Sequence, residues 1–373
     1  MVIAVNTQMP GEIRRDEIND FTVEIFSRII SLHPEHNFVF ICDEHEHVKN
    51  SFKDYNNIIY IASRHHKKNP AQWYIWHRIK LPVILKKYNV NAFLTYDMAS
   101  AGKIPQCIVI PHLSFIHQAF LYKKSYRLFY KKFLPQSIKK ARAIITSSQF
   151  CKEDIVKWFK ADANKITVIY NGVGNKYDHI SYDERERIKA KYSEGNEYFI
   201  YAGEIGNHKN LLNLLKAFSA FKKRQKSNMQ LFIAGAETYK YKNFYEDLRL
   251  FKFKDDVKIY NELQEEDLIS LIAASYAIVN PSKYEWSAAQ LLEAMSMRVP
   301  VIASSNGVMP EILADAASFA DPGNFKEFAV KMMSLFRDES LRSVLIERGK
   351  AQAEKYNWDE AAEAVWQIIN KII

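Results

Sequence analysis

The chain has 373 residues, 48% of them hydrophobic, so it is long enough for two domains with packed cores. Its three cysteines are too few and too scattered for a disulfide framework or a thiolate metal site, which fits a reducing compartment. The net charge of +9 lies in the first half, because residues 1–174 carry 25 Lys and Arg against 14 Asp and Glu, whereas residues 175–373 carry 27 against 29.

The N-terminal residues lack the basic start of a signal peptide and read as a strand instead. No apolar run approaches the ~18 residues that a membrane-spanning helix needs. We therefore expect a cytoplasmic protein.

Short apolar runs alternate with amphipathic segments along residues 1–174. The runs are VIAVN, FVFIC, AFLTY, CIVI, AIITSS and ITVIYNG, and the helical segments are residues 16–32, 72–88 and 149–159. Alternation of this kind predicts a parallel sheet with helices on both faces. The first domain is therefore predicted to span residues 1–174.

Residues 175–197 are polar and rich in charge, and we interpret them as a linker. The alternation then restarts with YFIYAG, LFIAG, VKIYN, AIVNPS and VPVIAS, with helical segments after most of these runs. A second α/β domain is therefore predicted over residues 198–356. Two doubly wound halves would face each other across a cleft at the carboxyl edges of their sheets.

The segment YAGEIGNHKN is a strand that runs into a glycine turn and a helix, with a lysine at the start of the helix. Gly203 and Gly206 allow the backbone to approach a ligand closely, and Lys209 adds a positive charge beside free helix amides. This is chemistry suited to a phosphate group. An ordinary loop with a surface lysine is the alternative.

The segment KYEWSAAQLLEAM places Glu285 before a predicted helix and Glu293 within it. Ser287 and Gln290 have the spacing of a capping box, which predicts that the helix begins near Ser287. Glu293 would then lie about 9 Å along the axis from free amides that favour an anion. The alternative is a pair of unrelated surface glutamates.

Together these segments resemble the family 4 retaining glycosyltransferases, which have the GT-B fold. The resemblance covers most of the chain and is strongest from Ala143 onward. It is carried by AIITSSQFCKEDIVKWFKADANKITVIYNGV, by YFIYAGEIGNHKNLLNLLKAF, by the E-x7-E pair within NPSKYEWSAAQLLEAM, and by PVIASSNGVMPEIL and SFADPGN in family order.

The resemblance implies two Rossmann-like domains, the first binding an acceptor and the second a UDP- or GDP-sugar, without a metal or other cofactor. It implies that Lys209 contacts the diphosphate, Glu285 the transferred sugar and Glu293 the ribose. Further donor contacts are implied at Gly203, Glu204, His208, Ser287, Ala288 and Ala289. It also implies that residues 357–373 form a last helix that crosses back to the first domain.

The chain departs from the family pattern at several positions. Glu204 stands where many relatives have an arginine, and His208 supplies a basic position before the lysine. The family's glycine-rich turn becomes Trp286 to Gln290, and a glycine loop of the first domain is reduced to Gly11.

Histidines are the remaining candidates in the first half. Strand-end His112 is predicted to face the cleft and bond the sugar or diphosphate, although it is displaced by one position from the family histidine, and His117 is its alternative. Four other histidines lack further ligands at the spacing of a metal site, so we expect them to be solvated loop residues. This group is His45, His47, His65 and His66.

Aromatic and basic residues alternate in residues 121–142, LYKKSYRLFYKKFLPQSIKKAR. The segment could lie on an anionic membrane or bind a lipid-linked acceptor, with its aromatic side inward and its lysines toward the headgroups. A plain basic surface is the alternative, and nucleic acid is disfavoured because no recognised motif is present.

The sequence thus predicts a hexosyltransferase that moves a sugar from a nucleotide-sugar to a saccharide or lipid-linked acceptor in cell-surface polysaccharide or glycolipid synthesis. It would be cytoplasmic or peripheral on the inner face of the membrane. The alternatives are a sugar-nucleotide epimerase or hydrolase of the same fold, and a degenerate scaffold that binds without catalysis.

Overall fold

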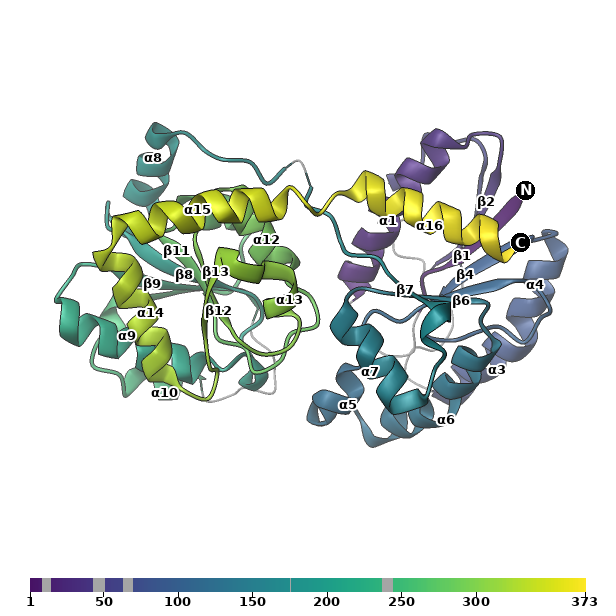
Figure 1. The fold of residues 1–373 in the computed structure, drawn as a ribbon, viewed down its shortest axis with the longest axis horizontal. Helices are drawn as coiled ribbons and strands as arrows, with labels where there is room; N and C mark the ends of the chain where they lie inside the picture. The colour runs from purple at the N-terminus through teal and green to yellow at the C-terminus, as the bar shows by residue number, and fades with distance from the viewer. Residues whose placement is uncertain (9–14, 43–50, 63–69, 175, 237–243) are drawn as a thin grey trace. The chain divides into compact units, whose positions relative to one another are not determined.

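The structure is a computed structural model that describes every residue except 9–14, 43–50, 63–69, 175 and 237–243. The chain divides into two compact units (Figure 1). Unit 1 comprises Met1–Asn171 and Asn357–Ile373, and unit 2 comprises Gly172–Tyr356.

Unit 1 is built on a seven-stranded parallel sheet in the order β3-β2-β1-β4-β5-β6-β7. The chain starts in the middle of the sheet and adds strands outward on both sides, so its direction switches between β1 and β4. Open α/β sheets bind ligands at such a switch point. The strands are β1 (Val2–Asn6), β2 (Asn37–Cys42), β3 (Ile58–Ala62), β4 (Ala92–Tyr96), β5 (Gln106–Val109), β6 (Ala143–Thr146) and β7 (Ile166–Val168).

Helices connect these strands. They are α1 (Arg15–Leu32), α3 (Pro70–Ile75), a π-helical turn (Trp76–Lys80), α4 (Leu81–Lys87), α5 (Ser114–His117), α6 (Lys124–Lys140) and α7 (Gln149–Phe159). The predicted helix over residues 72–88 is thus interrupted by the π-helical turn.

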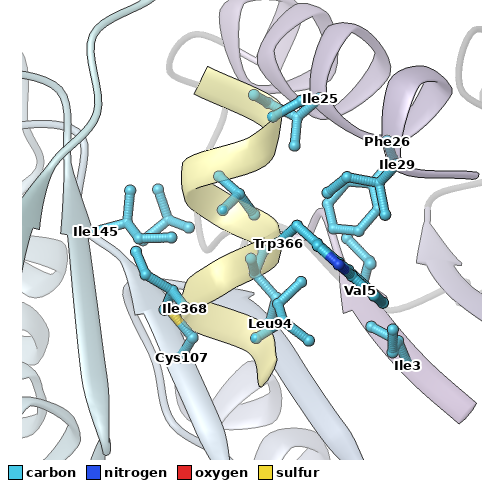
Figure 2. Close-up of a cluster of buried hydrophobic side chains, with 14 of the residues drawn as sticks. Ile3, Val5, Ile25, Phe26, Ile29, Leu94, Cys107, Ile145, Trp366 and Ile368 are labelled. Carbon is cyan, nitrogen blue, oxygen red and sulfur yellow. The ribbon is translucent and has the colours of Figure 1, made fainter. Parts of the chain in front are cut away.

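The C-terminal helix α16 (Trp358–Ile372) belongs to the core of unit 1. Trp366 and Ile368 of α16 are buried with Ile25 and Phe26 of α1 and with side chains of the sheet (Figure 2). Full burial of an aliphatic or aromatic side chain contributes about 1.5–3 kcal/mol. Residues 357–373 are therefore held in unit 1 by hydrophobic burial.

Unit 2 is built on a six-stranded parallel sheet in the order β10-β9-β8-β11-β12-β13. Its strands are β8 (Tyr198–Ala202), β9 (Gln230–Ala234), β10 (Val257–Tyr260), β11 (Ala277–Asn280), β12 (Val301–Ser304) and β13 (Ala317–Ala320). Its helices are α8 (Tyr182–Ser193), α9 (Leu211–Gln225), α10 (Phe244–Arg249), α11 (Glu265–Ala274), α12 (Ala289–Ser296), α13 (Met309–Leu313), α14 (Phe325–Arg337) and α15 (Glu339–Ala353). The predicted fold class, α/β with two doubly wound parallel sheets, is confirmed.

The interval 175–197 differs from the predicted linker, because it contains helix α8 and belongs to unit 2. Ser181 caps the helix by accepting from the amide of Glu184 at 3.2 Å. Arg185 donates to the carbonyl of Ala274 at 3.3 Å, and Lys189 donates to Glu197 at 2.8 Å. Because polar contacts hold this helix, its sequence has no apolar stripe from which the helix could be predicted.

Two strands that the sequence analysis missed, β3 and β13, are both edge strands. Three of the five residues of β3 are only half-buried and two are exposed, so the run lacks the continuous hydrophobicity of a buried strand. Among the described residues, no helix has the length and hydropathy to cross a membrane.

Candidate active site

The structure brings Lys209 and Glu285 together in unit 2, although they are 76 positions apart in the sequence. The Nζ of Lys209 donates to Oε1 of Glu285 at 2.5 Å, and the two side chains are 8% and 7% exposed. A buried charge is stabilised only when it is paired and hydrogen-bonded. This ion pair is therefore the electrostatic centre of the candidate site.

Asn210 and its neighbours hold the two loops of this pair against each other. Asn210 adopts a left-handed conformation with φ of 61° and begins α9. Its side chain donates to the carbonyls of Pro281 at 2.9 Å and Pro322 at 2.7 Å. The amide of Lys283 adds a longer bond of 3.4 Å to the carbonyl of His208. The loop after β8 is thereby tied to the loops after β11 and β13.

Gly203 lies in a close backbone contact at the end of β8. Its amide donates to the carbonyl of Ala234 at 2.9 Å. A Cβ on the neighbouring Gly235, which has φ of +149°, would lie 2.0 Å from the carbonyl oxygen of Gly203. Only glycine fits there, so Gly235 fixes the path of the loop that leads to Lys209.

Gly307 supports Glu285 and was missed by the sequence analysis. It has φ of +69°, and a Cβ at this position would lie 2.5 Å from the carbonyl oxygen of Glu285. The same carbonyl accepts from the amide of Val308 at 3.2 Å. The Asn306–Gly307 dipeptide is a turn signal that could have drawn attention to this loop.

The helix that carries Glu293 begins later than predicted. Helix α12 starts at Ala289, and its cap residue Ala288 has no side chain to accept an amide. Ser287 instead accepts from the amide of Ala289 at 3.3 Å, which closes a small turn before the helix. The capping box with Gln290 is therefore wrong, and Glu293 lies about 6 Å along the axis from the helix start, half-buried.

Glu204 and His208 face each other in the loop that precedes Lys209. The Nε2 of His208 lies 2.7 Å from Oε1 of Glu204, and the histidine is 5% exposed. The contact lacks the alignment of a hydrogen bond, so its strength depends on the charge of the ring. The acidic residue at the family's arginine position is thus matched by the basic residue four positions later.

The structure places His112 in unit 1, shortly after β5. It is half-buried, and its Nδ1 accepts from the amide of Ser114 at 3.3 Å. The preceding Pro111 is fixed because its carbonyl accepts from Ser147 at 2.7 Å. The alternative, His117, lies 2.5 Å from Oδ2 of Asp154 on α7 and so has a structural partner.

A buried polar cluster at the switch point of unit 1 was also missed. The side-chain amide of Asn6, at the end of β1, lies 3.3 Å from Nε2 of His77 and donates to Thr95 at 3.0 Å. Asp97 follows β4 and accepts from the hydroxyl of Tyr130 at 2.9 Å. Burial lowers the pKa of His77 to about 3. Burial also raises the pKa of Asp97 to about 7, opposed by the bond from Tyr130.

Helix α6 presents its lysines, and not its aromatic side chains, to the surface. Phe129 and Tyr130 are buried, and the other aromatic residues of residues 121–142 are half-buried. The rings fill the core of unit 1, so the aromatic side faces inward as predicted, and contact of the lysine side with an anionic membrane stays a prediction. The exposed face contains Lys124, Leu128, Lys131, Lys132 and Lys139.

Within the described residues, no three His, Cys, Asp or Glu side chains are grouped so that they could hold a metal ion. Five residues of the sequence analysis, Gly11, His45, His47, His65 and His66, lie outside the described residues.

Comparisons with known proteins match both halves of the chain. Residues 32–175 match the family described as Glycosyltransferase Family 4, and residues 183–352 match Glycosyl transferases group 1. The O-antigen chain mannosyltransferase B of Escherichia coli is 27% identical over 61% of this chain. The O-antigen chain mannosyltransferase RfbU of Salmonella typhimurium is 26% identical over 83% of it. The chain spans about 60% of the first relative and 82% of the second.

Solved structures agree on the fold. A glycosyltransferase from Rickettsia africae superposes with a TM-score of 0.76 at 18% identity, covering 100% of this chain and 98% of the other. The Anabaena protein Alr3699/HepE in complex with UDP and glucose gives 0.76 at 12% identity, covering 100% of both chains. The chain belongs to the family 4 glycosyltransferases of the GT-B type.

Proposed function

We propose that this protein transfers a hexose from a nucleotide-diphosphate sugar to an acceptor hydroxyl, with retention at the anomeric carbon, in the synthesis of a surface polysaccharide or glycolipid. The observation that carries the proposal is the buried contact between Lys209 and Glu285 at the carboxyl edge of the sheet of unit 2. It joins a cation suited to phosphate with a carboxylate suited to sugar hydroxyls.

The two residues can bind a nucleotide-sugar while their ion pair stays intact. The ammonium group of Lys209 has three N–H donors, and Glu285 occupies one of them. A phosphate oxygen can take another, while the second carboxylate oxygen of Glu285 accepts from hydroxyls of the transferred sugar. In this arrangement Lys209 stabilises the charge that grows on the leaving diphosphate.

The start of α12 adds further groups for the donor. Its first turn favours an anion, and Ala288 and Ala289 carry only methyl groups there. Glu293, on the same helix, is placed to accept from two ribose hydroxyls. The backbone at Gly203 and the pair formed by Glu204 and His208 complete the proposed donor contacts.

The names of the relatives indicate which donor sugar to test first. Two of the matched proteins are mannosyltransferases of O-antigen chains. We therefore propose a mannosyl group as the transferred sugar and an oligosaccharide, carried on a lipid, as the acceptor. His112 of unit 1 would contribute to binding of the sugar or the diphosphate.

The exposed lysines of α6 support the proposal that this reaction takes place at the cytoplasmic surface of an anionic membrane. Each Lys or Arg close to such a surface contributes about 1 kcal/mol of attraction. Several lysines exposed on one helix are thus sufficient for reversible association with the surface where a lipid-linked acceptor resides.

Nucleotide binding tests the donor site. A ligand that binds only the folded state raises its stability by RT ln(1 + [L]/Kd), so one of UDP, GDP and ADP is expected to raise the melting temperature selectively. Lys209→Met is expected to remove most of that shift. Lys176→Met, which removes a lysine from an exposed ion pair with Glu265 in the same unit, is the matched control. An equal response to all three nucleotides would contradict the proposal and favour a non-catalytic scaffold.

Turnover tests the reaction. The donor sugar of the selected nucleotide is expected to be consumed only with an acceptor, and proton NMR of the product is expected to show the anomeric configuration of the donor. Release of free sugar without an acceptor, or isomerisation of the donor, would instead identify a hydrolase or an epimerase.

A further inference from the structure

The continuous helical segment from α3 to α4 carries an exposed aliphatic stripe. Ile75, Ile79 and Val83 are 53%, 62% and 65% exposed, and they recur at every fourth position. The buried residues of the segment recur with the same spacing on its other side. These are Trp73, His77, Leu81 and Leu85, and Trp76 beside His77 is buried as well.

The π-helical turn Trp76–Lys80 keeps this stripe straight. In an α-helix a side chain at every fourth position drifts around the axis by about 40° per step, because one turn takes 3.6 residues. The i→i+5 bonds of a π-helical turn put more residues into each turn and oppose the drift. The three aliphatic side chains thus stay on the solvent side while the second set stays buried.

The exposed charge of the part of the chain that contains the stripe has one sign. Residues 70–152 contain 14 Lys and Arg, and their single acidic residue is Asp97. Asp97 is 4% exposed, so it adds nothing to the surface. Arg78, Lys80, Lys86 and Lys87 are exposed on the same segment as the stripe.

Helix α6 packs beside α3. The ring of Tyr74 lies 4.2 Å from that of Phe133, and the ring of Trp73 lies 5.9 Å from that of Phe129, measured between centroids. The two helices are neighbours in the ribbon drawing as well (Figure 1). The exposed lysines of α6 and its Leu128, which is 59% exposed, therefore lie on a helix that neighbours the first segment.

We propose that Ile75, Ile79 and Val83 are a membrane-insertion stripe that enters the interface of an anionic bilayer, with the surrounding lysines and arginines bound to lipid headgroups. Aliphatic side chains flanked by cations and without exposed acids have the chemistry of interfacial helices. The α6 lysines alone give attraction that salt screens, whereas the stripe adds hydrophobic burial that salt does not screen. The inference builds on the membrane location proposed above, and it is independent of the donor site.

Co-sedimentation of the full chain with vesicles tests the stripe. Phosphatidylcholine vesicles with about one third phosphatidylglycerol are compared with pure phosphatidylcholine, at low and high salt. The wild-type protein is expected to bind the anionic vesicles and to retain part of that binding at high salt. Ile79→Glu and Val83→Glu are each expected to lower the partition coefficient about tenfold or more.

Leu250→Glu is the matched control, because Leu250 is an 85% exposed leucine in unit 2. It is expected to bind vesicles as the wild type does. All three positions are exposed, so the melting temperatures should stay close to the wild type.

Three results would overturn the proposal: wild-type protein that ignores anionic vesicles, Ile79→Glu protein that binds them normally, or a leucine control that loses as much binding. A concentration-dependent dimer in analytical ultracentrifugation that Ile79→Glu abolishes would assign the stripe to a second copy of the chain instead. The nucleotide-induced melting shift separates this test from the donor site. If that shift persists while the wild-type protein does not bind anionic vesicles, the transferase proposal stands and the insertion stripe fails.

Discussion

The carboxyl edges of the two sheets differ in the buried ionisable groups that they hold. Unit 2 holds a charged pair, whereas burial in unit 1 favours the neutral forms. In unit 2, Lys209 and Glu285 are both buried and lie 2.5 Å apart as an ion pair. In unit 1, the buried His77 lies 3.3 Å from the side-chain amide of Asn6, and the buried Asp97 accepts from the hydroxyl of Tyr130. Burial disfavours the charged form of both groups and shifts the pKa of His77 down to about 3 and that of Asp97 up to about 7.

The difference shows how one architecture makes two kinds of polar edge. A buried group keeps its charge where the chain supplies a counter-charge, and otherwise its pKa shifts so that the neutral form is favoured. An edge with a fixed cation is suited to a diphosphate, whereas an edge whose groups favour their neutral forms is suited to hydroxyl groups. The predictions below alter one edge at a time.

Gly235→Ala should break the unit 2 edge most severely. The added Cβ would lie 2.0 Å from the carbonyl oxygen of Gly203, and the residue has φ of +149°. We expect a loss of more than about 4 kcal/mol in the free energy of unfolding, measured by urea denaturation. Gly195→Ala is the control, since Gly195 has φ of +78° and nothing within 4 Å of a Cβ, so only the conformational cost of about 1 kcal/mol applies. Equal losses in the two variants would contradict the close approach.

Removing one partner of the ion pair should cost almost as much. Lys209→Met leaves the carboxylate of Glu285 buried without its cation, and we expect a loss of about 3–5 kcal/mol. The double variant Lys209→Met, Glu285→Gln should recover much of that loss, because no buried charge remains. Urea denaturation of both single variants and the double variant measures the coupling. A double variant as unstable as the sum of the single ones would show that the two side chains do not interact.

The neutral groups of unit 1 should give opposing pH dependences of stability. Asp97 holds a proton in the folded state that it loses in the unfolded state between about pH 3.8 and 7, so its contribution falls as the pH rises through that window. His77 excludes a proton that the unfolded state binds between about pH 3 and 6.5, so its contribution is lost as the pH falls through that window. The two slopes, each about 1.4 kcal/mol per pH unit at most, cancel where the windows overlap.

Single variants should separate these slopes. Asp97→Asn should leave stability that rises with pH up to about 6.5, and His77→Gln should leave stability that falls with pH up to about 7. The free energy of unfolding at pH 4.5 and pH 7.5 measures both. Profiles identical to the wild type would mean that these groups are not neutral in the folded protein.

The smallest effect is expected at Glu204. Its carboxylate pairs with His208 in the proposed donor site, and its side chain is 38% exposed. Glu204→Gln should change the free energy of unfolding by less than about 1 kcal/mol. It should tighten nucleoside diphosphate binding about twofold to tenfold, because a negative charge near the phosphates is removed. Calorimetric titration measures the affinity, and weaker binding would show that the charge of Glu204 attracts the ligand and does not repel its phosphates.

The sequence by itself determined the elements that depend on local pattern. The buried strands and the alternating helices follow from hydrophobic periodicity, and the glycine turn before Lys209 and the segment around Glu285 follow from local composition. The sequence did not predict the edge strands β3 and β13, because they are short and partly exposed. It did not predict helix α8, because polar contacts hold that helix.

Only the tertiary structure decided which residues meet. The contact of Lys209 with Glu285 spans 76 positions, and the support of Glu285 by Gly307 depends on a third loop. The side of α6 that faces solvent also depends on its neighbours. Its aromatic residues pack against α3 and the rest of the core, so its lysines are left at the surface. These outcomes depend on long-range packing, and local sequence patterns carry no information about the partner of a side chain across the fold.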